Sequence, residues 1–507
     1  MPTIRKTKTG SGSTAVQVVY YKNRKLIVEK HIGSGKTDQE IETLVKEGKD
    51  WIKEHSIQEE LFPENPTGIS AVTGLKFLGV SHSYTYEILR RVGLHCGINS
   101  NEDSFLFDFA IMRLIEPASK LRTIKLLERY FDIIYSERTV YRKILSLGDK
   151  KQRIEQTAIK CAKGMLKDDL ALILYDVTTL YFETFKGDEL RVEGFSKDNK
   201  PQQPQIVVGL IVTCQGFPLG YEIFSGNTFE GKTMLKVLDN FTQENQVKMP
   251  IIVADAAMLS KENIEELRKR NLSYIVGARL GSTSLKIIET IHDKLLPKEL
   301  IPQNKDGQST RIKTDNTGEL VVDFSQARYR KDKNEMDKQL LRAKALVENN
   351  QSGKHVKFVK RKDKNDQYIL NEALIQKTKL LLGMKGYLTN IPAKVLSNKD
   401  IITRYHDLWH VEQAFRMAKS DLASRPIFHH KQEAVKSHIL ICFTALMIGK
   451  FLEINIKLSL KQIIDALWVI TDAKLYDKTT KNTFSIRSEL NQNSQDVVHK
   501  IDIALSY

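Results

Sequence analysis

The stretch ALILYDVTTL (residues 171–180) is a short apolar run that contains one carboxylate, Asp176. Apolar, aromatic and β-branched residues over so few positions are typical of a buried strand. A carboxylate in an apolar layer is costly unless it is paired, hydrogen-bonded or bound to a metal. The stretch therefore predicts a strand inside a sheet and makes Asp176 a candidate for chemistry, with a capping role at the strand end as the alternative.

The segments that follow this strand alternate between strand and helix patterns. Two strands separated by the turn pair Gln215-Gly216 come first, and helices then separate two further strands. The expected elements are strands Gln205–Thr213 and Pro218–Ser225, helix Glu230–Gln243, strand Ile251–Asp255, helix Lys261–Asn271 and strand Leu272–Leu280. The order β-β-β-α-β-α-β predicts an α/β fold built on a mixed sheet.

A second aspartate, Asp255, ends the apolar run that begins at Ile251. Ligands of open α/β sheets collect at the carboxyl ends of the strands. Two aspartates in such places can share a hard divalent cation, since Mg²⁺ is held in proteins by one or two carboxylates together with substrate phosphates. Asp176 and Asp255 are therefore candidate metal ligands.

A third candidate carboxylate lies in residues 400–422, which contain neither Gly nor Pro and predict one long helix. Tyr405, Glu412 and Lys419 are seven residues apart, which places them on nearly one helical face, with Arg416 one turn after Glu412. This row of side chains would suit a DNA backbone that passes across a metal site. An ordinary surface pair of Glu412 with Arg416 is the alternative.

The sequence resembles the DDE transposases of bacterial insertion sequences. Tyr405, Glu412 and Lys419 match the element Tyr-x2-Arg-x3-Glu-x6-Lys of one large group, but Leu408 stands at its Arg position, so that the task of this Arg would fall to Arg404 or Arg416. The order and spacing of further blocks carry the resemblance over most of the chain: Tyr175–Thr179, Gly194–Asp198, Gly226–Thr228, Val253–Asp255 and Glu412–Arg416.

The resemblance implies an RNase H-like catalytic fold, with a β-rich insertion before the helix of the final acid. It implies that Asp176, Asp255 and Glu412 hold two Mg²⁺ ions, which Mn²⁺ can replace, and that Tyr405 and Lys419 hold backbone phosphates. The implied partners are double-stranded DNA, namely the terminal inverted repeats and the target DNA, and a second copy of the chain in the DNA complex. Water would free a 3′-hydroxyl at each end, and this hydroxyl would attack the target.

The expected division of the chain follows from these patterns. The first part contains a hairpin of strands Ala15–Tyr21 and Lys25–Lys30, a helix Asp38–His55 and a linker Phe62–Pro66. The expected parts are a strand hairpin with a helix (1–65), a helical DNA-binding domain (66–166), the first part of the catalytic core (167–280), a β-rich insertion (281–392), the second part of the core (393–450) and a helical tail (451–507).

Within the helical domain, Ser119–Tyr130 and Ser136–Leu147 read as two short amphipathic helices. Ser136 is a candidate N-cap of the second helix. The second helix carries three cations on exposed spacings: Arg138, Arg142 and Lys143. A helix-turn-helix with its second helix in a DNA groove fits this pattern, and so does any helical hairpin with a solvated face.

The composition favours a nucleic-acid partner. Lys and Arg outnumber Asp and Glu by 78 to 62, which gives a net charge of +16 without a basic tail. An anionic membrane surface ranks second, but no basic amphipathic helix supports it. A basic protein without such a partner stays open. Four scattered cysteines without a CxxC spacing argue against a zinc site or disulfides: Cys96, Cys161, Cys214 and Cys442.

The sequence also favours a cytoplasmic, nucleoid-associated protein. No segment was expected to approach the roughly 20 apolar residues of a membrane span, and no apolar segment of a secretory signal follows Met1. Two other functions remain open beside the transposase. The first is a catalytically inactive or domesticated DNA-binding regulator, and the second is an RNase H-like nuclease that cuts DNA without joining it.

Overall fold

The structure of the chain is a computed structural model. It describes residues 2–22, 25–55, 74–98, 102–166, 170–245, 250–258, 260–296, 307–314, 318–349, 356–361 and 368–506. The chain divides into two compact units, Met1–Phe77 with Leu475–Phe484 and Leu78–Lys474 with Ser485–Tyr507. The expected linker Phe62–Pro66 lies outside the described residues, and the boundaries expected within the second unit stay predictions.

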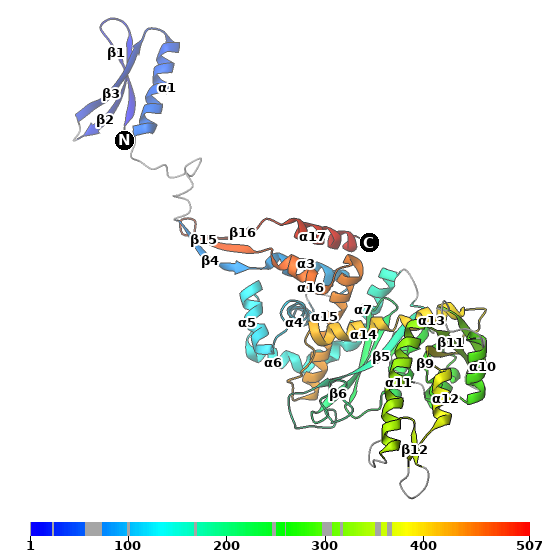
Figure 1. The fold of residues 1–507 in the computed structure, drawn as a ribbon. Helices are drawn as coiled ribbons and strands as arrows, with labels where there is room; N and C mark the ends of the chain where they lie inside the picture. The colour runs from blue at the N-terminus through cyan, green and yellow to red at the C-terminus, as the bar shows by residue number, and fades with distance from the viewer. Residues whose placement is uncertain are drawn as a thin grey trace. The chain divides into compact units, whose positions relative to one another are not determined.

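The first unit contains an antiparallel sheet of order β1-β2-β3. Its strands are β1 (Thr3–Lys8), β2 (Thr14–Lys22) and β3 (Lys25–Gly35), and helix α1 (Asp38–His55) packs along them (Figure 1). Val16, Val18 and Val19 of β2 are buried. The expected hairpin and helix are confirmed, and β1 adds an edge strand that the sequence pattern did not indicate.

The second unit is organised around an eight-stranded sheet of order β10-β11-β14-β9-β8-β5-β6-β7. Five strands of this sheet agree with the expected strands within about two residues: β5 (Leu172–Tyr181), β6 (Gln205–Thr213), β7 (Pro218–Ser225), β8 (Ile251–Ala254) and β9 (Tyr274–Ala278). β5, β6 and β7 are antiparallel neighbours, whereas β5–β8 and β8–β9 are parallel pairs. The expectation of a mixed α/β sheet is confirmed.

The two faces of the central strands are covered by different helices. Helix α8 (Thr233–Asn245) contacts β6 and β7, and the Tyr175 hydroxyl of β5 donates to Thr233 Oγ1 on that side at 2.7 Å. Helices α13 (Asn398–His406) and α14 (Trp409–Arg416) cover the other side, where α13 contacts β8 and β9 and α14 contacts β5 and β6. Because neighbouring side chains of a strand point to opposite faces, Asp176 lies on the α13–α14 side.

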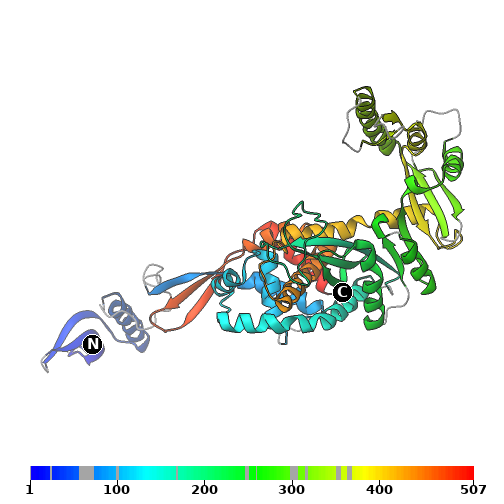
Figure 2. The ribbon, with the colours of Figure 1, turned by 90° about the horizontal axis from the view of Figure 1, so that it is seen from below.

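The expectation of a β-rich insertion at 281–392 is corrected. Its strands β10 (Ser309–Thr314), β11 (Gly318–Phe324) and β14 (Met384–Thr389) extend the main sheet, and β12 (Val359–Arg361) pairs with β13 (Tyr368–Leu370). Three helices make up much of the remainder: α10 (Leu285–Leu295), α11 (Gln326–Glu348) and α12 (Glu372–Leu380). Figure 2 shows α11 and α12 in yellow-green beside the β12–β13 hairpin. Helix α11 buries only Met336 and Ala343, so its sequence carries little apolar periodicity and did not indicate a helix.

The expected helical region 66–166 is helical in the described residues from Ser83 onward. Its helices are α3 (Ser83–His95), α4 (Ser104–Ile115), α5 (Lys120–Phe131), α6 (Glu137–Ser146) and α7 (Lys151–Leu166). The expected N-cap of α6 is confirmed, because Ser136 Oγ accepts a hydrogen bond from the Thr139 amide at 3.2 Å. Ser119 caps α5 in the same way.

Helix α15 (Gln432–Ile456) corrects the expectation that no segment matches a membrane span. It is 25 residues long and apolar enough to cross a membrane by length and composition. However, 83% of its most apolar part is buried inside the structure, where it contacts α3, α4, α6, α7 and β7. A helix that is apolar on all sides is typical of a protein core, and these contacts place α15 there.

The expected helical tail 451–507 is also corrected. It contains the end of α15 and helices α16 (Leu460–Trp468) and α17 (Gln492–Leu505), with strands β15 (Asp472–Asp477) and β16 (Thr483–Arg487) between them. These strands join β4 (Leu75–Ser81) in a sheet of order β16-β15-β4. The short helix α9 (Lys261–Lys269) lies between β8 and β9 in the sequence, as expected.

Candidate active site

Two aspartates occupy adjacent positions on neighbouring parallel strands. In the β5–β8 pairing, Tyr175 lies opposite Ala254, and the next residue of each chain is an aspartate, Asp176 and Asp255. Parallel neighbours are about 4.8 Å apart, and residues at the same level point to the same face. The pairing therefore places both carboxylates side by side at the α13–α14 face of the sheet.

The groups around Asp176 shift its pKa in opposite directions. Burial raises the pKa of Asp176 to about 6, while the Lys197 ammonium acts in the opposite direction. The negative charges of Glu230 and Asp255 raise the pKa further. A bound cation would compensate this repulsion. The electrostatic environment of Asp176 is therefore the one expected for a metal ligand rather than for a carboxylate whose charge the protein already neutralises.

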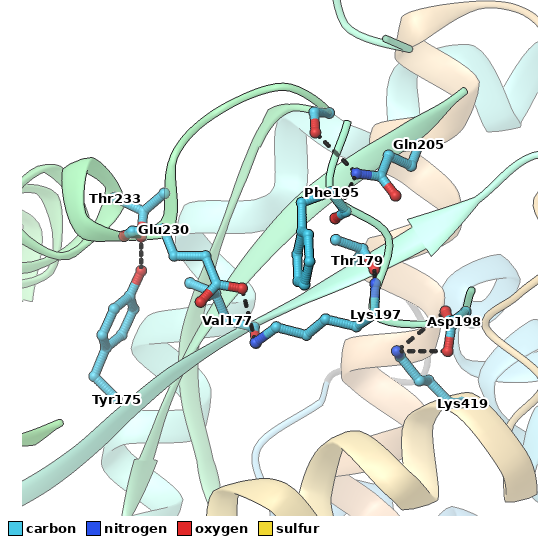
Figure 3. Close-up of polar contacts among 11 residues, drawn as sticks. Tyr175, Val177, Thr179, Phe195, Lys197, Asp198, Gln205, Glu230, Thr233 and Lys419 are labelled. Atoms are coloured by element: carbon cyan, nitrogen blue, oxygen red, sulfur yellow. Dashed lines mark hydrogen bonds and ion pairs between the residues drawn. The ribbon is translucent and has the colours of Figure 1, made fainter. Parts of the chain in front are cut away.

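Lys197, in the loop between β5 and β6, contacts β5 at residues next to Asp176, and Figure 3 shows these contacts. Its Nζ donates to the Val177 carbonyl oxygen at 2.7 Å and forms an ion pair with Glu230 Oε1 at 2.9 Å. Its backbone amide donates to Thr179 Oγ1 at 3.0 Å. Lys197 is thus held at β5 by two contacts, beside the residue that follows Asp176. The sequence analysis quoted the block Gly194–Asp198 but assigned Lys197 no role.

Tyr405 is the partner of the second aspartate. Its hydroxyl donates to Asp255 Oδ1 at 2.9 Å, and burial, followed by the Asp255 charge, raises the pKa of Tyr405. The ring lies over Gly277 of β9, where an added Cβ would come within 2.4 Å of the hydroxyl oxygen. Gly277 therefore leaves the space that Tyr405 needs to reach Asp255. In the structure this residue, expected at a phosphate, contacts a candidate metal ligand.

Lys385 is a cation near the candidate acids that the sequence analysis did not single out. Its Nζ lies 4.6 Å from the centroid of the Tyr405 ring and 5.9 Å from that of Tyr387. Burial lowers the pKa of Lys385, and the nearby charges of Asp255 and Glu412 act in the opposite direction. Lys385 is therefore the residue that electrostatically connects the second aspartate with Glu412. No motif or spacing in the sequence indicated this position.

The long helix expected at Asp400–Leu422 is corrected to three pieces. Between α13 and α14 the backbone forms tight i→i+3 hydrogen bonds, from the His410 amide to Asp407 and from the Val411 amide to Leu408. A π-helical turn, Met417–Asp421, follows α14 and is closed by the bond from the Leu422 amide to Met417 at 3.0 Å. The argument from seven-residue spacing holds only for a regular α-helix, so it no longer places Lys419 in line with Glu412.

Glu412 lies in the first turn of α14 and is exposed. Among the described residues it forms no ion pair with Arg416, so the alternative of an ordinary surface pair has no support. Arg416 is exposed and lines a separate cavity of about 520 Å³ together with Trp409 and Lys450. Among the residues that the structure describes, the Glu412 side chain thus has no ion pair or hydrogen bond, and Arg416 lies at a different feature.

The donor set of the two aspartates fits a hard divalent cation, since carboxylate oxygens are the ligands that Mg²⁺ and Mn²⁺ prefer. The raised pKa of the half-buried Asp176 beside Asp255 supports this fit. Within the described ranges no three His, Cys, Asp or Glu side chains are close enough together to hold a metal. Glu412 is on the helix that covers the same face but is not gathered with the two aspartates.

Lys419 is occupied by a carboxylate in this structure (Figure 3). Its Nζ lies 3.2 Å from both carboxylate oxygens of Asp198, and Arg425 forms a further ion pair with Asp198 at 3.3 Å. Only 13% of the Lys419 side chain is exposed. Two cations thus converge on one carboxylate at the place where the sequence analysis expected a DNA phosphate.

The expected DNA-contacting cations of α6 lie in the helical region, apart from the sheet that carries the aspartates. Arg138 and Arg142 are exposed. Lys143 is partly buried, with its Nζ 5.4 Å from the ring centroid of Phe105 and 5.7 Å from that of Tyr135. Lys143 therefore packs on the neighbouring aromatic rings, whereas the two arginines point away from the core.

The raised pKa of Asp176 predicts how metal binding depends on pH. A cation binds the carboxylate form, so the Mn²⁺ affinity of the metal-free protein should rise with pH up to about 6 and then level off. Below that value it should fall by about tenfold per pH unit. Titration calorimetry with Mn²⁺ at several pH values measures this. A carboxylate with the ordinary pKa of about 3.9 would give a flat affinity between about pH 5 and 7. The variant Asp176→Asn, in which this proton is absent, serves as the control.

One comparison with known proteins shows the family of the chain. The family described as transposase DDE domain matches residues 169–448, which is more than half of the chain and includes both aspartates and Glu412. The comparison with curated proteins gives no match. Among solved structures, a chain of the piggyBac transposase synaptic complex with hairpin DNA is similar at 9% identity and a TM-score of 0.38, over 84% of this chain and 80% of that chain. The resemblance to DDE transposases is confirmed, and the chain belongs to the transposase DDE domain family.

Proposed function

We propose that this protein is the transposase of an insertion sequence. It binds the terminal inverted repeats, cleaves the DNA at the ends and joins the freed 3′-hydroxyl to target DNA. The observation that carries the proposal is the pair Asp176 and Asp255 at the same level of two parallel strands, under the helix that carries Glu412, in a chain of the transposase DDE family. The proposal assigns catalysis to these three acids.

We further propose that the catalytic sheet is RNase H-like. Support comes from the strand order β7-β6-β5-β8-β9, in which three antiparallel strands are followed by two parallel ones. This is the β-β-β-α-β-α-β arrangement that the sequence resemblance implies. The strands β10, β11 and β14 would then be additions to the edge of this core beyond β9.

Asp176, Asp255 and Glu412 would hold two divalent cations, Mg²⁺ or Mn²⁺, which when bound activate water as a nucleophile and stabilise the leaving oxygen. The surrounding residues prepare the acids for this. Tyr405 fixes the orientation of Asp255 by its hydrogen bond, and Lys197 favours the ionised form of Asp176. The ammonium of Lys385 supplies a positive charge near Asp255 and Glu412. Positioning and electrostatics are the main contributions that a protein makes to phosphoryl transfer.

Two features support the proposal that DNA completes the site. Glu412 is exposed on the covering helix, and the proposal requires its side chain to turn toward the aspartates when DNA is bound. Lys419 and Arg425 already converge on the Asp198 carboxylate, an anion that a backbone phosphate resembles in its hydrogen bonding. We propose that a phosphate near the cut site replaces Asp198 at Lys419, and that two copies of the chain pair the two ends.

Removal of one acid should separate binding from chemistry. The variants Asp255→Asn and Glu412→Gln should each lose Mg²⁺-dependent cleavage and joining of a labelled DNA end, by at least about 10³-fold. Both should keep end binding within about twofold, because the acids contribute little to DNA affinity. Glu289→Gln, which changes an exposed glutamate of α10, is the matched control and should behave as the wild type.

Other outcomes of this assay identify the alternatives. Cleavage without joining by the wild type would favour a nuclease. Binding without cleavage or joining would favour a regulator that has lost catalysis. An equal loss of end binding and cleavage in both variants would remove the assignment of these acids to the chemistry.

End recognition is proposed to involve helix α6, since Arg138 and Arg142 are exposed on it. If both arginines contact phosphates, the double variant Arg138→Gln with Arg142→Gln should have a shallower slope of log affinity against log salt concentration. The change in slope should correspond to the loss of about two phosphate contacts. Filter binding over a range of salt concentrations measures this slope. The control pair Lys461→Gln with Lys500→Gln removes the same charge from exposed sites on α16 and α17. An identical slope in both double variants would exclude α6 from the DNA interface.

A further inference from the structure

A cavity of about 730 Å³ lies within the second unit, and none of the three candidate acids lines it. Its walls come from the end of α4, the beginning of α5, helix α6 and the segment that follows the π-helical turn. The lining contains basic side chains but no acidic one, with the basic members Arg113, Lys120, Arg425, His429, His430, Lys431 and His438. We call it the basic cavity.

Two buried histidines and two cations form the inner part of the basic cavity. Lys120 Nζ donates to His429 Nδ1 at 3.1 Å, and Arg113 lies 3.5 Å from His438 Nδ1. The two histidines are 8% and 4% exposed. Burial lowers the pKa of His429 to about 3 and lowers that of His438 as well, so that both rings are neutral. The positive charge therefore resides on Lys120 and Arg113.

These two cations have no carboxylate to compensate them. Arg113 otherwise donates to the backbone oxygens of Leu422 and Ala423. In the part of the chain that the structure describes, neither Arg113 nor Lys120 forms an ion pair, and burial lowers the pKa of Lys120. A partly buried cation without an anion is unfavourable. Lys120 Nζ also lies 4.8 Å from the centroid of the Tyr141 ring. An ammonium has three donors, and the hydrogen bond to His429 uses one of them, so Lys120 can also donate to an anion in the cavity.

The N-terminus of α5 adds to the positive potential. Ser119, Lys120 and Leu121 line the cavity, and they are the N-cap and the first two residues of this 12-residue helix. The N-terminus of a helix carries a partial positive charge from its unpaired amides. Its position beside Lys120 and Arg113 makes the inner part of the cavity suited to a phosphate.

The outer part of the basic cavity is apolar and aromatic. Tyr141 is 47% exposed and Phe428 is 66% exposed, and Leu121 and Leu145 are exposed to 41% and 40%. Exposed apolar rings beside a cationic interior suit a ligand with an anionic head and a flat body. The volume falls within the range of about 300 to 1,000 Å³ that is usual for sites of small molecules.

We propose that the basic cavity binds a nucleotide, with its phosphate at Lys120 and Arg113 and its base against Tyr141 or Phe428. The nucleotide comes either from solution or from a DNA strand. This goes beyond the proposed cleavage and joining, because none of the candidate catalytic acids lines the cavity. Binding can therefore be measured in a chain that cannot cleave DNA.

The test uses the full chain with Asp255→Asn and three probes, inorganic phosphate, deoxyadenosine monophosphate and a short DNA duplex, measured by titration calorimetry. Lys120→Gln should weaken deoxyadenosine monophosphate binding by about tenfold or more, because hydrogen bonds to charged groups are strong. Lys125→Gln removes the same charge from an exposed site of α5 outside the lining. It should change the affinity by less than about twofold.

Tyr141→Ala separates the nucleotide from phosphate alone. It should weaken deoxyadenosine monophosphate binding while the inorganic phosphate affinity is kept. Competition by the duplex, with the same loss in Lys120→Gln, would identify DNA as the source, whereas a duplex that does not compete would identify a free nucleotide. Lys431→Gln, at an exposed position of the lining, provides a second charge variant in case Lys120→Gln fails to fold.

Two results would overturn the proposal. Equal affinity of deoxyadenosine monophosphate for the parent, Lys120→Gln and Lys431→Gln would show that the cavity binds no phosphate. Loss of binding in the lysine variants with no effect of Tyr141→Ala or Phe428→Ala would reduce the site to one for a simple anion and refute the nucleotide. Neither result depends on whether the chain cleaves DNA, so the proposed function would stand or fall separately.

Discussion

The pairing of β5 with β8 is the constraint on which the candidate site depends. Tyr175 faces Ala254 in this parallel register, so that the next residues, Asp176 and Asp255, stand side by side. A shift of the register by one residue would turn one aspartate to the opposite face of the sheet. Ile173, Leu174, Ile252 and Val253 of these two strands are almost completely enclosed, so both faces of the pair lie inside the core. The strands that form the core therefore also carry the two acids.

Two neighbouring carboxylates repel each other, and the residues around them reduce the cost. Lys197 lies beside Asp176, Tyr405 donates to Asp255, and Lys385 attracts both Asp255 and Glu412. Gly277 makes the Tyr405 contact possible because a side chain there would collide with the phenol. Burial, with a smaller contribution from the charges of Glu230 and Asp255, still raises the pKa of Asp176 to about 6. A bound cation would stabilise the ionised form of this buried carboxylate, which is a physical reason to expect cations at the site.

The sequence predicted the elements whose apolar pattern is strong. The strands from Leu172 to Ala278 and the cap at Ser136 were found where the periodicity and capping chemistry placed them. Helix α11 was missed because it buries few side chains. The contacts of Lys197, Lys385 and Lys419 could not be predicted, since their partners are brought near only by the tertiary fold. The spacing of Tyr405, Glu412 and Lys419, together with the order of the other blocks, indicated the family, but the π-helical turn altered the alignment of these three residues.

The central claim is that Asp176, Asp255 and Glu412 form one metal site. The most direct measurement is a crystal structure of the protein with a DNA end and Mn²⁺, in which anomalous scattering locates the ions. The account predicts Mn²⁺ with oxygen ligands from Asp176 and Asp255, with the Glu412 carboxylate turned from its exposed position to the ion pair. Manganese bound elsewhere, or at the two aspartates with Glu412 still turned to solvent in the DNA complex, would contradict it.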